Sequence, residues 1–333
     1  MMPIGLGLFA VIALILLANI IEAGKNETYF RLFTWLLLLI NLPVMLFGIA
    51  LVILPADLLT GLMTASSGLL SLNWQTAGLS LVLMGLWGFV VSLPASRRLL
   101  ARWLPLDAAS PVHALGLVLA GYLLGNTIFS LTQGGLEELA ETAVSTSIYE
   151  ILLMQTLFAA IALLGVGLYT RRSPGETRTR LGLERPTGHQ ILVGTAWIMV
   201  LVMLQAIAGG IWMLMDSSQA ELLEGISSEL LGDIDTVLEW ALLAGATGVG
   251  EELLFRGAIQ PIFGLGVTAF LFATAHVQYG ITPVTVIVFI IGIILGLIRR
   301  RYNTTTSIFV HAGYNFVLGM LSLVALQLEQ MIG

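Results

Sequence analysis

Long apolar stretches recur from one end of this sequence to the other, and short polar loops separate them. Most are close to the roughly 20 residues that a helix needs to cross a bilayer. The pattern therefore predicts an all-α polytopic membrane protein with about ten transmembrane helices. We place these helices near Pro3–Ile21, Leu32–Leu54, Ala77–Leu93, Val112–Leu131, Ile151–Tyr169, Ile191–Met215, Val237–Phe263, Val267–Tyr279, Val284–Ile298 and Thr306–Leu326.

Composition agrees with this pattern. The 333 residues are 57% hydrophobic and 10% charged, with a mean hydropathy of +0.96, whereas soluble domains carry about 25% charged residues. The first run has neither a basic segment before it nor a small-residue cleavage site after it, so we expect it to remain as a helix. We expect a multi-pass protein of the cell membrane, with the lipid bilayer as its surroundings.

Two further counts exclude classes of function. The chain has no cysteine, which excludes disulfides, thiolate metal sites and a cysteine nucleophile. Its net charge of −6 and its few basic residues argue against nucleic acid as a partner.

Charged residues in the loops predict an orientation and a domain division. Basic residues are found in every second loop, and loops rich in basic residues tend to stay cytoplasmic. Both termini are therefore expected to face outward. The richest of these loops spans 171–188 and contains Pro174 and Pro186. We interpret it as an Arg-rich cytoplasmic linker. It would separate an N-terminal membrane extension of about five helices, residues 1–170, from a C-terminal domain at 189–333.

Three charged side chains stand together in "GVGEELLFRG", within the seventh predicted helix. Ionisable residues inside a membrane span are functional candidates by default. Glu252 and Arg256 are four residues apart and can pair on one helix face. Glu251 is rotated by about 100° from Glu252, so we expect it to be short of partners and suited to act as a general base. An ion pair that only locks helices together stays an alternative for Glu252 and Arg256.

Glycines precede these acids at positions 245, 248 and 250. They would let a neighbouring helix approach closely, and they could instead admit a substrate to the backbone.

Two of the four histidines also lie inside apolar runs: His276 in "FATAH" and His311 in "HAGYN". Phe272 precedes His276 by four residues and Asn315 follows His311 by four, so each pair would share a helix face. At about 1.5 Å per residue, Glu251, His276 and His311 would stand about 14–18 Å, about 14 Å and at most about 15 Å from the cytoplasmic face. The three side chains are therefore predicted at one depth, although a purely structural network would have the same spacing.

The segments "EELLFRG", "FATAH" and "HAGYN" resemble the EExxxR, FxxxH and HxxxN motifs of the CPBP family. These are the CAAX-protease and bacteriocin-processing intramembrane proteases, also called Abi-type proteins. The resemblance covers roughly Thr236–Leu326 and identifies 189–333 as the expected protease domain.

The resemblance implies hydrolysis of a peptide bond in a membrane-associated or lipidated substrate. By motif position, Glu251 would activate water with help from His276. His311 and Asn315 would hold water or stabilise the oxyanion, and Glu252 and Arg256 would support the first glutamate.

Metal dependence is open at this point. Glu251, His276 and His311 could supply the three protein ligands of a catalytic zinc. Their spacing differs from HExxH, and hydrolysis by the glutamate without metal is the preferred hypothesis.

Two other classes of function remain. A non-enzymatic immunity or scaffold protein of the same fold would keep the helices without needing Glu251. An ion-coupled transporter would use buried carboxylates and histidines as a pathway. Transporters often show related halves, which this sequence lacks.

Overall fold

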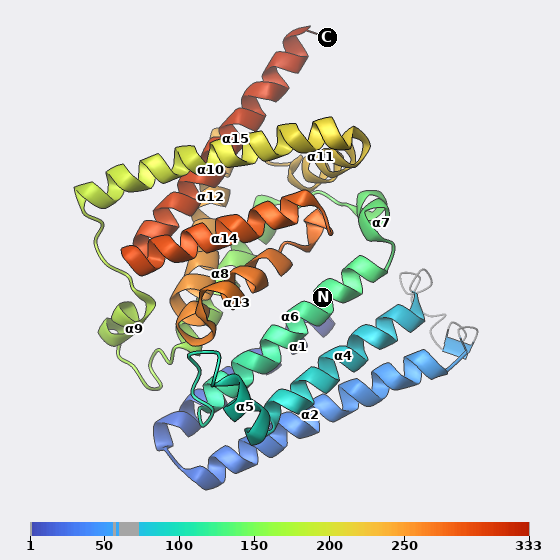
Figure 1. Ribbon diagram of the computed structural model, residues 1–333, viewed down its shortest axis with the longest axis vertical. Coiled ribbons are helices and arrows are strands. Elements are labelled where there is room, and N and C mark those ends of the chain that lie inside the picture. Colours follow the sequence, from blue (N-terminus) through green and yellow to red (C-terminus); the bar gives the residue numbers. More distant parts are fainter. Residues whose placement is uncertain (1, 56–57, 60–72, 333) are drawn as a thin grey trace. The chain divides into compact units, whose positions relative to one another are not determined.

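The computed structural model describes residues 2–55, 58–59 and 73–332, which form helices joined by short loops (Figure 1). No strand is formed within these ranges. The elements are α1 (Met2–Gly24), α2 (Glu27–Ile53), α4 (Trp74–Ser92), α5 (Pro94–Leu100), α6 (Pro111–Thr132), α7 (Gly135–Thr142), α8 (Ile148–Gly165), α9 (Pro174–Leu181), α10 (Gly188–Met215), α11 (Ser217–Leu231), α12 (Val237–Glu252), η2 (Leu253–Ile259), α13 (Gln260–Thr274), η3 (Val277–Tyr279), α14 (Pro283–Arg301) and α15 (Thr304–Ile332).

The predicted all-α polytopic fold is confirmed, with one change in the helix count. Among the described residues, nine helical stretches are long and apolar enough to cross a membrane. The run expected at Val267–Tyr279 is not counted as a separate span, because its helix is part of one long stretch, Val237–Thr274, and ends at Thr274. The turn expected near Gly264 is present: this residue has φ 76° and ψ 176°, a conformation that glycine adopts without steric penalty.

Contacts divide the chain into two compact units, and each is described by itself. The first unit comprises Met1–Leu139 with Thr274–Ile281, and the second comprises Ala140–Ala273 with Thr282–Gly333. This division groups α8 with the C-terminal helices. The functional boundaries predicted at residues 170 and 188 stay a prediction.

Glycines set the packing of α2 against α4 in the first unit. A Cβ atom on Gly48 would lie 2.6 Å from the backbone nitrogen of Val82, and one on Gly85 would lie 2.5 Å from that of Met45. The two backbones therefore touch where side chains would otherwise keep them apart, which is a common way for membrane helices to associate.

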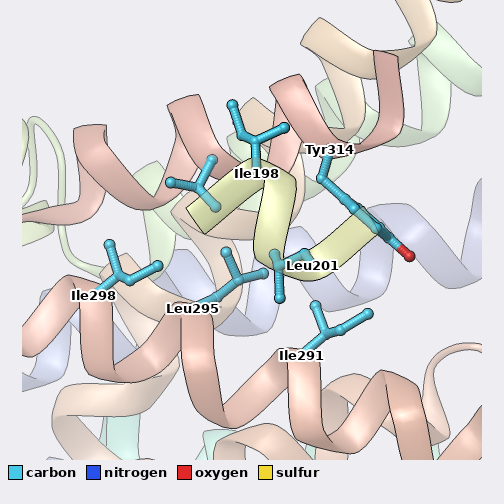
Figure 2. Close-up of a cluster of buried hydrophobic side chains, with 7 residues drawn as sticks. Ile198, Leu201, Ile291, Leu295, Ile298 and Tyr314 are labelled. Carbon is cyan, nitrogen blue, oxygen red and sulfur yellow. The ribbon is translucent and has the colours of Figure 1, made fainter. Parts of the chain in front are cut away.

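Apolar side chains of α10, α14 and α15 form a core in the second unit (Figure 2). Leu201, Leu295 and Val310 are fully buried in it. Burial of such side chains between helices holds α14 against α15, and α15 carries one of the candidate histidines.

The Arg-rich segment is folded rather than extended. Its helix α9 begins with a capping box between Ser173 and Glu176. Leu181 is buried against Leu253 and Ala258. Arg180 Nη1 donates to the carbonyl oxygen of Gly257 at 2.8 Å, and burial, reinforced by neighbouring arginines, lowers the pKa of Arg180 to about 10. This segment therefore supports η2, the element that follows the two glutamates.

Candidate active site

The paired glutamates lie at the end of α12. The predicted capping box between Thr236 and Glu239 starts this helix, with each side chain bonded to the backbone of the other residue. After Glu252 the chain continues as a π-helix, η2, which holds Arg256. π-Helical turns are rare and often occur at functional sites.

Polar side chains of two elements surround the Glu252 carboxylate. Arg256 Nη1 lies 3.2 Å from Glu252 Oε1, so the predicted pair is present, and both side chains are almost completely buried. Ser307 Oγ donates to Oε2, and His311 Nδ1 lies 3.0 Å from Oε1. The carboxylate is thus balanced by one cation and fixed by groups of η2 and α15.

The contact with Glu252 fixes the tautomer of His311. A carboxylate can only accept a hydrogen bond, so Nδ1 carries the hydrogen. In the neutral ring Nε2 then has a lone pair, which can accept a hydrogen bond from water. When both nitrogens are protonated, Nε2 can donate to an anion.

Aromatic rings cover this network. The guanidinium of Arg256 lies over the ring of Phe272, 4.2 Å from its centroid. The same ring makes edge contacts with Phe255 and with His311, at centroid distances of 5.3 and 5.9 Å. Phe272 therefore packs against the ion pair and the imidazole and contributes to their burial.

Glu251 has a partner that the sequence did not indicate. Gln155 Nε2, from α8, donates to Glu251 Oε1 at 3.1 Å, and both side chains are buried, with about 8% of their surface exposed. The expectation that Glu251 is short of partners is therefore wrong. The physical reason is that α8 packs against this face of α12, which helix spacing alone does not reveal.

Small residues make that approach feasible. A Cβ atom on Gly250 would lie 2.6 Å from the carbonyl oxygen of Gln155, and one on Gly248 would lie 2.8 Å from Cβ of Ala312. A Cβ atom on Gly245 would meet nothing within 4 Å. Close helix approach, the first of the two readings of these glycines, is confirmed at Gly248 and Gly250 but not at Gly245.

Asn315 lies one turn beyond His311 on α15, so the predicted helical pair is present. Its Nδ2 donates to Thr247 Oγ1 at 2.9 Å, and that hydroxyl bonds to backbone carbonyls of its own helix. Thr247 lies one helical turn before Glu251 on α12, and it thus holds the Asn315 amide at that point. An amide nitrogen carries two hydrogens, so Asn315 has a second one to donate.

His276 lies outside the helix that was expected to contain it. Helix α13 ends at Thr274, and His276 precedes η3 with φ −97° and ψ 52°. The expected helical face shared with Phe272 is therefore absent, and the depth inferred for His276 does not apply. The physical reason is tertiary: in the first unit, Thr127 Oγ1 of α6 donates to the carbonyl oxygen of Thr274 at 2.8 Å, where the helix ends. The His276 ring stacks on Tyr279.

Sequence reasoning missed three side chains of this site: Gln155, Ser307 and Thr247. Two of them had a usable signal, since Ser307 precedes His311 by four residues and Thr247 precedes Glu251 by four. Gln155 showed only as one polar residue within a long apolar run.

Zinc was left open through Glu251, His276 and His311. Within the described ranges, no group of three or more His, Asp or Glu side chains is arranged to hold a metal ion. On His311, Nε2 is the ring nitrogen left for water or a metal, because Nδ1 faces Glu252. Metal dependence stays a prediction.

Comparison with known proteins supports the interpretation of these motifs. Residues 233–317 match a family model described as type II CAAX prenyl endopeptidase Rce1-like. This segment is about a quarter of the chain and contains all three motifs. The resemblance to the CPBP family is thereby confirmed over that segment. Searches of curated proteins and of solved structures gave no match.

Proposed function

We propose that this chain is an endopeptidase embedded in the cell membrane, since residues 233–317 match the model of the Rce1-like type II CAAX prenyl endopeptidases. It would hydrolyse a peptide bond in a membrane-associated or lipidated protein or peptide. The family description favours a substrate with a prenylated C-terminus.

The main support is the different surroundings of two adjacent carboxylates. Glu252 forms an ion pair with Arg256 and hydrogen bonds with Ser307 and His311, which suits a fixed structural anion. Glu251 accepts a hydrogen bond from the side-chain amide of Gln155. Arg256 lies against Glu252, and a paired cation lowers the proton affinity of a carboxylate, so Glu252 is poorly suited to act as the base.

The proposed reaction uses Glu251 as general base. Its carboxylate takes a proton from water as the water oxygen bonds to the carbonyl carbon, and the carbonyl electron pair moves to oxygen. Asn315 and His311 hold the water or stabilise that oxyanion, and His276 assists Glu251 in activating the water. The carbon–nitrogen bond then breaks, and Glu251 returns the proton to the leaving amine.

Cleavage of a prenylated peptide by the purified protein in lipid vesicles tests this proposal. Glu251→Gln and His276→Ala are expected to lower kcat by about 10²–10⁴-fold, as for loss of a general acid–base group. Glu239→Gln, at the half-buried acid in the N-terminal capping box of the same helix, is the matched control and should keep wild-type cleavage. Unchanged cleavage by Glu251→Gln removes that residue from the mechanism. The same assay in the presence of a metal chelator tests whether cleavage depends on zinc, and cleavage is expected to persist.

The two rival functions predict other results in the same vesicles. A transporter would show ion flux that depends on Glu251 and no cleavage. An immunity or scaffold protein would show neither, and its binding to a partner would tolerate Glu251→Gln.

A further inference from the structure

We infer that Gln155 of α8 is a positioning residue for the Glu251 carboxylate, an inference that rests on the proposed function. Gln155 lies outside the segment that matches the family model and within the part of the sequence first interpreted as a membrane extension. Its Nε2 donates to Glu251 Oε1 at 3.1 Å. The contact joins residues 96 positions apart and is buried on both sides.

The backbone holds Gln155 close to the glutamates. Because Gly250 has no side chain, the carbonyl group of Gln155 rests directly against α12 beside Glu251. Any residue other than glycine at position 250 would place Cβ 2.6 Å from that carbonyl oxygen, so α8 would have to move away. The backbone of Gln155 is therefore held against Gly250, the residue before Glu251. From that position the Gln155 amide reaches the Glu251 carboxylate.

An amide has the chemistry that a base-orienting group needs. It donates through nitrogen and does not titrate, so it fixes the rotation of the Glu251 carboxylate without adding a charge. A lysine or arginine here would pair with the carboxylate and weaken it as a base. An apolar side chain would remove this hydrogen bond to the carboxylate, and misdirected catalytic groups lose rate steeply.

The test replaces Gln155 by a side chain of similar shape without a donor. Gln155→Met should lower kcat by about tenfold to a hundredfold, the range for one hydrogen bond to a charged group, with KM within about twofold of wild type. Gln205→Met on α10 is the control, because it makes the same change at a half-buried amide that contacts Tyr314 instead of an acid. This control should keep wild-type kcat.

A spectroscopic readout separates positioning from general destabilisation. The infrared band of the Glu251 carboxyl group is identified as the band lost in Glu251→Gln. It should shift in Gln155→Met and stay in place in Gln205→Met.

Each other result contradicts a particular claim. If the wild type is active and Gln155→Met has an unchanged kcat or an unshifted carboxyl band, this inference is overturned and the proposed function is not. Equal losses of kcat in both methionine variants also overturn it, since they indicate destabilisation. A wild type that cleaves no prenylated peptide overturns the proposed function, and the catalytic role of Gln155 with it.

Discussion

At the scale of single residues, the site separates a sealed ion pair from a neighbouring acid. Glu252 and Arg256 are almost completely buried and form an ion pair, and Arg256 Nη2 also donates to the carbonyl oxygen of Gly292 at 3.3 Å. Removing one partner of such a pair leaves an uncompensated buried charge, whereas removing both charges can be nearly neutral.

This difference yields a stability prediction. Arg256→Met should lower the free energy of unfolding by about 3–5 kcal/mol, because the Glu252 carboxylate would lose its cation. The double variant Glu252→Gln with Arg256→Met should recover much of that loss. Thermal unfolding in detergent gives both values, and a double variant no more stable than the single one would contradict the argument.

Cleavage by the same double variant decides what the pair does. If the pair supports Glu251, the double variant stays folded and loses activity. Wild-type cleavage by it would assign the pair to helix packing alone.

The sequence was sufficient to predict contacts between residues that lie close together along the chain. Spacing of four brings Glu252 and Arg256 onto one face of an α-helix, so the pair could be predicted. The contact of Gln155 with Glu251 depends on which helix packs against α12, and apolar runs carry no such information. The position of His276 was missed for a similar reason. Thr127 donates a hydrogen bond to Thr274, the residue at which the helix before His276 ends, and the apolar pattern does not reveal this contact.

At the scale of elements, glycines decide how closely α8 and α15 approach α12. Gly250→Ala should lower both stability and cleavage, because its Cβ would meet the backbone of Gln155. Gly245→Ala has open space around Cβ and should raise stability by about 0.4–1 kcal/mol. Thermal unfolding and kcat measured for the pair check this. A Gly250→Ala protein as active as Gly245→Ala would contradict the packing argument.

At the scale of the whole molecule, the expected orientation can be tested because the chain has no cysteine. Thr179 on α9 and Ser228 on α11 are both exposed. Basic loops tend to stay cytoplasmic, so an impermeant maleimide should label Ser228→Cys on intact cells and Thr179→Cys only after permeabilisation. The opposite pattern of labelling would reverse the orientation.

The ion pair also bears on how the chain enters the bilayer during synthesis. Each charge at a span centre disfavours insertion by about 2.5–3.5 kcal/mol, but Glu252 and Arg256 lie one turn apart and can neutralise each other within their own segment. Gln155 leaves the ribosome before Glu251 does, whereas Ser307 and His311 follow later. The Gln155 amide on α8 can therefore be in the bilayer before Glu251 enters it. Helix α15 is synthesised last, and its side chains Ser307 and His311 complete the cluster around the glutamates.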